Sequence, residues 1–268
     1  MQHPENEGVG SPSSAPGWES RTRVLLGDDG MARLASSTVC VIGLGAVGGY
    51  AVEGLARAGV GMVRLVDFDV IRESNINRQL LALRSTLGRP KADVAAGRVL
   101  DINPDIRVDV RREFADAGAM PSLLDGVDIL IDAVDSLTPK IDIIHAGAIA
   151  GTPVYSSLGA ATRLDADALR FGPLFSAKGC PLGRLVRKRL RRRGIEGGDL
   201  WCVFSGESRN LDAVRDPEEE QPDGAGEYRR GRRRTVLGSL PTVTGLFGLR
   251  LAHEATLRLA GKSSKRDN

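Results

Sequence analysis

The chain has 268 residues, 41% of them apolar and 26% charged, which is typical of a globular protein with room for one large domain or two small ones. No apolar stretch approaches the roughly 20 residues of a membrane span, and the first 20 residues lack the basic start and apolar core of a secretory signal. Three scattered cysteines, Cys40, Cys180 and Cys202, exclude a disulfide framework, and the lack of a CxxC pair excludes a four-thiolate zinc site. We therefore expect a cytoplasmic protein that does not contact a membrane.

The first part of the chain alternates between two patterns. Residues 1–20 are polar and predict a disordered tail. Short apolar runs, typical of buried strands, then occupy residues 37–45, 61–69, 105–114, 126–136 and 152–159. Helical spacing occupies residues 46–58, 88–104 and 139–150. This alternation over residues 21–159 predicts an α/β, Rossmann-like fold, a mainly parallel sheet with helices on both faces.

The pattern changes after Gly159, so residues 160–261 are predicted to form a smaller α+β part. Its expected elements are a hairpin at 161–172, a basic helix at 181–194, a strand at 199–207 and a closing helix that ends at Gly261. Residues 206–234 are predicted to be a mobile loop, and residues 262–268 a tail.

Charge is unevenly distributed along a chain whose net charge is only +3. Lys and Arg crowd residues 184–193 and 229–234, whereas the segment between these clusters is acidic. A cationic face on a nearly neutral protein indicates a polyanionic partner. Four cations lie on or near the polar side of the basic helix and are predicted to contact that partner: Arg187, Lys188, Arg191 and Arg192.

The segment "GLGAVGG" follows the first predicted strand and opens a helix. Its glycines Gly43, Gly45 and Gly48 permit a tight turn and a close approach of phosphate to the backbone, and the helix behind them offers unpaired N–H groups. Asp67 ends the second strand, where an acid bonds a ribose hydroxyl. The pattern fits NAD and ATP equally, or a tightly packed turn without a ligand.

The residues beyond Asp67 favour ATP, because phosphate chemistry needs cations that hydride transfer does not. The candidates follow the second strand in order: Asn75, Arg78, Gln79 and Lys91. Asp135 ends the fourth strand, at the edge where ligands collect in such sheets, and is placed to hold Mg²⁺ through one carboxylate. Each residue alone could be a solvated loop residue; the set predicts a triphosphate site.

The ordered motifs "GLGAVGG…DFD…NINRQ…GRPKAD…INP…DAVDS" resemble the ubiquitin-activating-like adenylating superfamily, which includes ThiF, MoeB and HesA. The resemblance implies that the glycine loop and Asp67 hold ATP and that Asp135 binds Mg²⁺. It further implies that Asn75, Gln79 and the catalytic cations Arg78 and Lys91 grip the phosphates. The segment "SRTRVLLGDDGM" is similar to the family's N-terminal helix, which implies a homodimer in which an arginine crosses to the partner's ATP. Arg21 fits that role best, with Arg23 as the alternative.

The second half, including "KGCPLGRLVRKRLRRRGI" and "CVFSGE", is similar to the tRNA threonylcarbamoyladenosine dehydratase branch (the TcdA or CsdL group). That branch implies adenylation of a carboxylate on tRNA position 37, cyclisation with net loss of water, contact with the anticodon stem-loop, and a cysteine-desulfurase or sulfur-acceptor partner. Cys202 is expected in the core, and Cys180 is the weaker candidate for a chemical role. Two alternatives remain: adenylation of the C-terminus of a small sulfur-carrier protein, and a non-catalytic nucleotide-binding scaffold.

Overall fold

The computed structural model describes residues 17–215 and 236–263. Most of the predicted mobile loop at 206–234 and most of both predicted tails therefore lie outside the described residues. A seven-stranded sheet has the order β3-β2-β1-β4-β5-β7-β6, and every pair is parallel except β6 with β7. The strands are β1 (Thr38–Ile42), β2 (Met62–Val66), β3 (Arg107–Arg111), β4 (Ile129–Asp132), β5 (Val154–Ser157), β6 (Leu169–Pro173) and β7 (Leu200–Ser205). A separate antiparallel pair joins β8 (Val214–Arg215) to β9 (Val236–Leu237).

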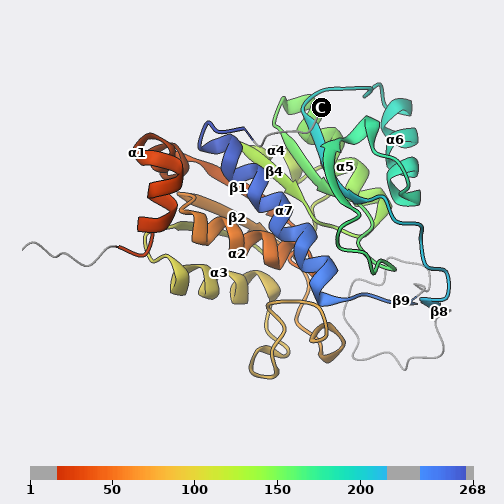
Figure 1. Cartoon of the computed structure of the whole chain (residues 1–268), viewed down its shortest axis with the longest axis horizontal. Coiled ribbons are helices and arrows are strands. Elements are labelled where there is room, and N and C mark those ends of the chain that lie inside the picture. The colour runs from red at the N-terminus through yellow and green to blue at the C-terminus, as the bar shows by residue number, and fades with distance from the viewer. Residues whose placement is uncertain (1–16, 216–235, 264–268) are drawn as a thin grey trace, which may run out of the picture.

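Helices cover both faces of the sheet, which confirms the predicted α/β class (Figure 1). One face packs against α1 (Ser20–Ser36), α2 (Gly48–Ala58), α3 (Lys91–Ile102) and α7 (Pro241–Leu259). The other packs against α4 (Met120–Leu124), α5 (Leu137–Ala150) and α6 (Pro181–Arg192). Short 3₁₀ turns are η1 (Glu73–Asn75), η2 (Arg84–Thr86) and η3 (Leu174–Ser176). Within the described ranges, no helix is both long enough and apolar enough to cross a bilayer.

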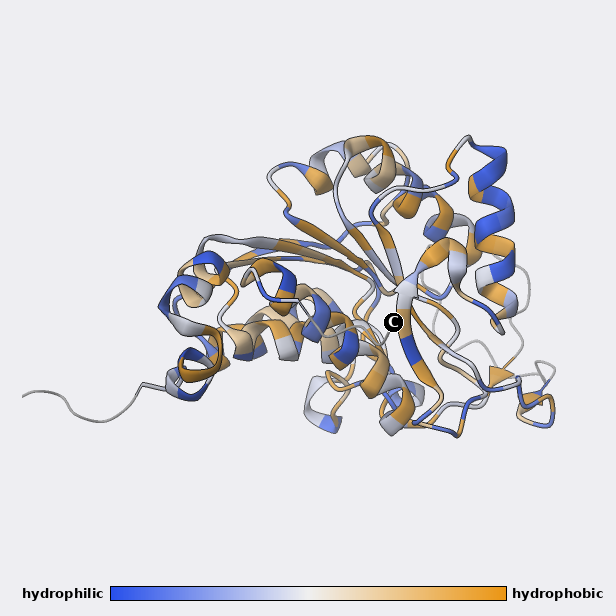
Figure 2. Cartoon of the chain, turned by 45° about the horizontal axis from the view of Figure 1, so that its top comes forward, coloured by the Kyte–Doolittle hydropathy of each residue, from blue (hydrophilic) through white to orange (hydrophobic). Residues whose placement is uncertain are grey.

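Strand β1 shows why the central strands read as continuous apolar runs. All five of its residues are buried, with Val39 and Val41 in the core under α2 and α7, and Cys40 and Ile42 in the core under α4 and α5. A strand covered on both faces has no solvent side, so its sequence does not alternate between apolar and polar residues. Figure 2 shows apolar colouring along these inner strands and polar colouring on the outer surfaces of several helices.

The sheet continues across the predicted boundary at residues 159–160, because β7 pairs with β5 in parallel. The predicted hairpin at 161–172 is wrong: only its end forms a strand, β6, and that strand pairs with β7. The N–H groups of Leu164 and Asp165 bond instead to the carboxylate of Glu207, and the Asp165 carboxylate accepts from the N–H of Asp167. These side-chain acceptors satisfy the backbone in a turn, so this stretch forms no first strand.

The two edges of the sheet differ in their protection. The β3 edge carries Arg107, Asp109 and Arg111 at alternate positions. The β6 edge carries the exposed Arg170 and ends at Pro173, which has no N–H to offer a further strand.

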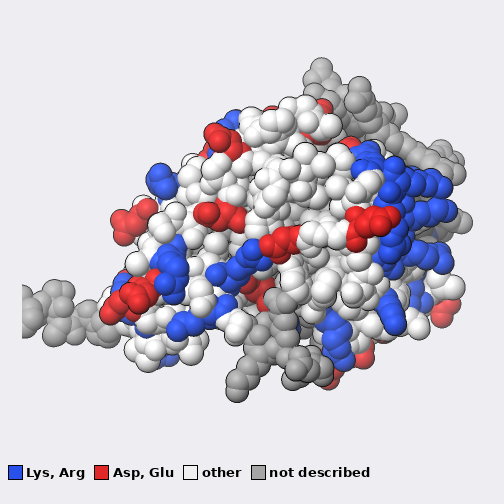
Figure 3. All heavy atoms as spheres, turned by 90° about the horizontal axis from the view of Figure 1, so that it is seen from above, with Lys and Arg blue, Asp and Glu red and all other residues white. Residues whose placement is uncertain are grey.

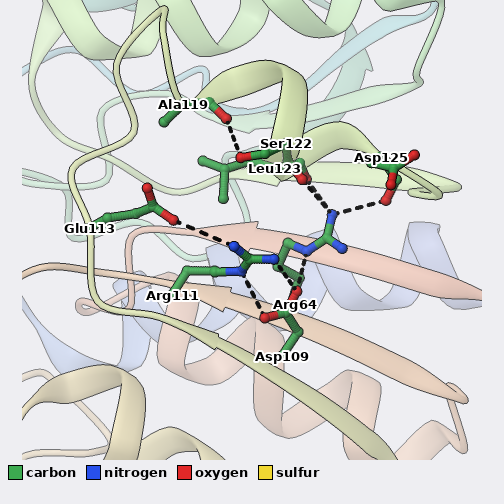
Figure 4. Close-up of polar contacts among 8 residues, drawn as sticks. All are labelled: Arg64, Asp109, Arg111, Glu113, Ala119, Ser122, Leu123 and Asp125. Atoms are coloured by element: carbon green, nitrogen blue, oxygen red, sulfur yellow. Dashed lines mark hydrogen bonds and ion pairs between the residues drawn. The ribbon is translucent and has the colours of Figure 1, made fainter.

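A buried arginine ties α4 to the sheet (Figure 4). Arg64 lies on β2, and its Nε donates to the Asp109 carboxylate at 2.7 Å. Its Nη1 donates to three carbonyl oxygens at the end of α4, those of Leu123 at 2.8 Å, Asp125 at 3.0 Å and Ser122 at 3.3 Å. Burial opposes ionisation of Asp109, but hydrogen bonds from Arg111 and Arg64 outweigh it and hold the Asp109 pKa below its usual value. The guanidinium therefore caps a short helix whose last carbonyls have no helical partner.

We expect Arg64→Met to lower the free energy of unfolding by about 2–4 kcal/mol, because it leaves the buried Leu123 carbonyl and two partly buried carbonyls without their donor. Urea unfolding followed by circular dichroism measures the loss. The control is Arg111→Met, which removes a more exposed bond to the same Asp109 and should cost much less. Equal losses in the two variants would contradict a special role for the α4 cap.

Candidate nucleotide site at the switch point of the sheet

The glycine loop lies between the end of β1 and the start of α2. Gly43 has φ +90°, and a Cβ there would meet the Ala133 carbonyl at 3.0 Å. A Cβ on Gly48 would lie 1.8 Å from the Gly43 oxygen, so both glycines are required by the packing of the loop itself. Gly45 differs, because a Cβ there would meet only the Gln79 Nε2, at 3.8 Å. The protein packing does not demand a glycine at position 45; a close ligand would.

The loop stands at the topological switch point of the sheet. The chain runs from β1 outward through β2 and β3 on one side, and β4 and β5 lie on the other. The carboxyl ends of β2, β1 and β4 are adjacent, so Asp67, the glycine loop and Asp135 follow neighbouring strands at one edge. Open α/β sheets bind their ligands in this position.

Asp67 is oriented by the backbone around it. Its Oδ2 accepts from the Leu44 N–H of the glycine loop at 2.7 Å, and its Oδ1 accepts from the Asp69 N–H at 2.8 Å. Burial raises the Asp67 pKa, and the nearby charge of Lys91 opposes that rise. The carboxylate is thus fixed beside the loop, with lone pairs that a ribose hydroxyl could still use.

Lys91 lies near the carboxyl ends of the central strands because the chain between Val70 and Pro90 folds back on itself. A β-bridge joins those two residues. Lys91 is the first residue of α3, its side chain is 7% exposed, and its Nζ lies 3.0 Å from the Asp69 carboxylate. A lysine at a helix N-terminus places a positive charge at the positive end of the helix dipole. This placement does not stabilise the helix. The arrangement is suited to an anion beside α3.

The segment around η1 holds the other predicted phosphate ligands. Arg78 donates from Nη1 to the Ser74 carbonyl at 2.9 Å and to Asn77 at 2.8 Å, so its guanidinium lies against its own turn. The Asn75 side-chain oxygen accepts from the Arg72 N–H at 3.1 Å. In the described structure, no hydrogen bond or ion pair joins Arg78 to Lys91, Asp67 or Asp135.

Gln79 has a buried polar atom that the described residues leave without a partner. The residue is 9% exposed, and its buried Oε1 has no hydrogen-bond partner within the described part of the chain. Its Nε2 faces Gly45, as the glycine geometry above shows. A buried acceptor without a donor is costly, so a ligand donor at the glycine loop would satisfy it.

Asp135 lies on the loop between β4 and α5. The residue is exposed, and its Oδ1 accepts from the Ser136 hydroxyl at 3.2 Å. No group of three or more His, Cys, Asp or Glu residues forms a metal cage in the ranges that the structure describes. One exposed carboxylate fits Mg²⁺, which is commonly held by one or two carboxylates together with phosphate oxygens.

The N-terminal helix distinguishes the two candidate arginines. Arg23 pairs with Glu19, the residue before α1, and with Asp28, just beyond the kink at Gly27. Arg21 is exposed and makes no hydrogen bond or ion pair with the described residues. Val24 and Leu25 beside it are 89% and 79% exposed, so α1 presents an apolar surface together with Arg21.

Lys and Arg side chains gather over α6 at one end of the molecule (Figure 3). Lys188, Arg191 and Arg192 are exposed as predicted, and the Arg191 guanidinium lies over the Phe175 ring. Arg187 differs from the prediction: it is half-buried, and its buried Nη1 has no partner among the described residues. Gly183 has no side chain and leaves space one turn earlier on the helix. The Arg187 Nη1 occupies this space, 3.2 Å from the position that a Gly183 Cβ would take.

The sequence prediction did not include two buried charged features of the structure. Asp132 and Lys140 form a fully buried ion pair next to Asp135, with 2.6 Å between Nζ and Oδ2. Arg163 is 3% exposed, and its Nε lacks a partner within the described chain. A charged residue inside an apolar segment, such as Lys140 in "LTPKIDII", is the signal that could have identified the pair.

The fold is α/β, and the candidate nucleotide site lies at the switch point of its sheet. The chain belongs to the ThiF family, whose model matches residues 19–267. It is 38% identical over 190 residues to a tRNA threonylcarbamoyladenosine dehydratase of Bacillus subtilis, covering 70% of this chain and 74% of that protein. The Escherichia coli protein of the same name is 34% identical over 203 residues, covering 71% and 75%. A crystal structure of the E. coli enzyme in complex with ATP superposes with TM-score 0.79 at 29% identity, covering 92% of this chain and 96% of that chain.

Proposed function

We propose that this protein is an ATP-dependent tRNA threonylcarbamoyladenosine dehydratase. The observation that carries the proposal is the presence, on one chain, of a glycine loop at the switch point of the sheet and a strongly cationic helix. The names of the B. subtilis and E. coli relatives supply the substrate. Because that substrate is tRNA, we place the protein in the cytoplasm.

The site residues take the following roles in this proposal. Glycine-loop N–H groups bind phosphate, the Asp67 carboxylate accepts from a ribose hydroxyl, and Gln79 Oε1 accepts a ligand donor. Three side chains that follow β2 in the sequence stabilise the phosphate charge: the amide of Asn75 and the cations of Arg78 and Lys91. Asp135 holds Mg²⁺, which neutralises phosphate charge when bound. The orphaned Gln79 oxygen and the uncrowded Gly45 are the structural features that fit a bound nucleotide.

The chemistry needs no protein nucleophile. A carboxylate oxygen of the threonylcarbamoyl group attacks the α-phosphorus of ATP, pyrophosphate leaves, and an acyl-adenylate forms. A nitrogen of the same substituent then attacks the acyl carbon, loses its proton and expels AMP, which closes the ring with net loss of water. Because the nucleophile is already attached to the acyl group, the second step is intramolecular.

Cysteine burial argues against the form of the sulfur-carrier alternative in which an enzyme thiol receives the adenylated C-terminus. All three cysteines are buried. Burial raises the pKa of Cys40 and of Cys202 to about 12, and the Cys180 sulfur accepts from the Gly183 N–H. Reactive thiols need exposure and a lowered pKa, so these side chains are poorly suited to receive an acyl group. The cysteine-desulfurase or sulfur-acceptor partner stays a prediction from resemblance.

The function is tested by incubating the purified protein with MgATP and tRNA that carries threonylcarbamoyladenosine, followed by mass spectrometry of the nucleosides. We expect a nucleoside lighter by one water, formed only with ATP. Calorimetric titration should show ATP binding and no comparable NAD binding. Tight NAD binding without ATP binding, or unchanged nucleosides, would remove the proposal.

We propose that exposed cations of α6 contact tRNA phosphates, so Lys188→Glu/Arg192→Glu should weaken tRNA binding. Each lost phosphate contact should flatten the log–log salt dependence by about 0.7–0.9. ATP affinity should stay unchanged because the glycine loop leads into α2, which covers the opposite face of the sheet from α6. The control Arg107→Glu/Lys262→Glu makes the same charge change at exposed sites outside α6. Filter binding across salt measures both slopes, and an unchanged slope in the α6 variant would exclude the docking role.

We also propose a homodimer in which Arg21 serves the partner's ATP. The exposed Val24 and Leu25 supply apolar surface for the contact. An inactive Arg21→Ala chain mixed with an inactive Asp135→Asn chain should regain partial activity, because one mixed site has both native residues. Arg23→Ala alone should stay active, which distinguishes the two candidate arginines. No recovery, once subunit exchange is demonstrated, would contradict an arginine supplied in trans.

A further inference from the structure

A fully buried polar network lies beneath the proposed nucleotide site. Lys140 Nζ donates to Asp132 Oδ2 at 2.6 Å, to the Ser157 carbonyl at 2.9 Å and to Ser156 Oγ at 3.3 Å. The Ser156 hydroxyl donates to the same Asp132 oxygen at 2.6 Å, and the other Asp132 oxygen accepts from the Val134 N–H at 3.2 Å. Lys140, Asp132 and Ser156 are each 0% exposed. The network therefore joins the ends of β4 and β5 to the first turns of α5 and to the loop between β4 and α5.

Stability alone does not account for this network. Burying two charges costs several kcal/mol per ion, and a buried pair is often no more stable than apolar residues of similar size. Lys140 also lies near the N-terminus of α5, where the helix dipole disfavours a cation. Neither side chain reaches solvent, and the hydrogen bonds of both go to other groups of the fold.

The network contacts the short loop that lies between the glycine loop and Asp135. Ala133 donates its N–H to the Ile42 carbonyl, and it is the neighbour that prevents a side chain on Gly43. A Cβ on Gly48 would also lie 3.3 Å from the Ala133 Cβ. The Asp132 carboxylate accepts a hydrogen bond from the Val134 N–H, and Asp135 is the next residue in the chain. Residues 133 and 134 thus connect the network with the glycine loop on one side and with Asp135 on the other.

We propose that Asp132 and Lys140 are positioning residues that fix the glycine loop relative to Asp135, through the hydrogen bond from the Val134 N–H to Asp132. The inference rests on the proposed nucleotide site. Lys140 and the Ser156 hydroxyl hold one oxygen of the Asp132 carboxylate, and the second oxygen accepts from the Val134 N–H. Outer-shell groups of this kind commonly determine how well a metal ligand is placed.

Two neutral double variants separate positioning from stability. Asp132→Asn/Lys140→Met removes both charges but keeps a side-chain oxygen for the Val134 N–H. Asp132→Val/Lys140→Met removes both charges and that oxygen. We expect similar thermal stability in both, and about 10- to 100-fold weaker MgATP binding in the Val variant than in the Asn variant. Calorimetry with MgATP measures this without any tRNA.

Equal MgATP affinity in the two doubles would overturn the inference, whatever the substrate. Wild-type protein that binds MgATP but leaves tRNA unchanged would overturn the dehydratase proposal alone. If the Val variant does not fold, Ser156→Ala decides, because it removes one hydrogen bond from Asp132 without burying an unpaired charge. We expect it to weaken MgATP binding by at least about threefold, the value of one modest hydrogen bond, and unchanged binding would overturn the inference.

Discussion

Asp135→Asn is expected to abolish dehydratase activity and leave the fold intact. The amide has the shape of the carboxylate but lacks the charge that holds Mg²⁺. Because Asp135 is exposed, the change should not alter the thermal unfolding midpoint. Nucleoside mass spectrometry measures the activity, and circular dichroism measures the fold.

The control for this variant is Asp105→Asn, which neutralises another exposed acid, one that precedes β3 and lies outside the site. It should keep the wild-type rate. Activity of Asp135→Asn within about threefold of wild type, a difference below 1 kcal/mol, would show that the carboxylate holds no catalytic metal.

Lys91→Ala is expected to cost about 2–4 kcal/mol of transition-state stabilisation, or about 30- to 1,000-fold in kcat/KM, as for loss of one preorganised donor. Arg78→Ala should have a similar effect, provided that its guanidinium leaves its own turn when nucleotide binds. Steady-state kinetics with varied MgATP measure both losses.

Asp69→Ala separates a phosphate role for Lys91 from a structural one. It removes the ion-pair partner of Lys91 but keeps the cation. If Lys91 acts on phosphate, this variant should lose far less activity than Lys91→Ala. Equal losses would show that the 3.0 Å ion pair, rather than the cation, is what the site requires.

The core of the fold could be predicted from the sequence because its signals are local. The apolar run ending in "GLGAVGG" contains a strand, a turn that only glycine can make at positions 43 and 48, and the start of a helix. Asp67 follows a strand of the same kind. Where each residue stands relative to a strand end is a local property, and a parallel sheet then brings those ends to one edge.

The remaining features depend on contacts between distant segments. Strand β6 pairs with β7, about 30 residues later in the chain, and no local pattern indicated this pairing. Arg187 turns inward because Gly183 leaves space one turn earlier on α6, which helical spacing alone does not show. The partner of Lys140 is Asp132 on the preceding strand, and the burial of that pair arises only when α5 packs on the sheet.

The protected edges of the sheet limit how this protein can associate with itself. Strand addition needs a flat row of unpaired N–H and C=O groups, and inward or edge charges and proline disfavour it. Alternating Arg107, Asp109 and Arg111 occupy one edge, and Pro173 ends the other. A second copy should therefore not extend the sheet, in solution or during aggregation. Within the described residues, self-association is left to side-chain surfaces such as the exposed Val24 and Leu25 of α1, and we expect no fibre-like growth by strand addition to the seven-stranded sheet.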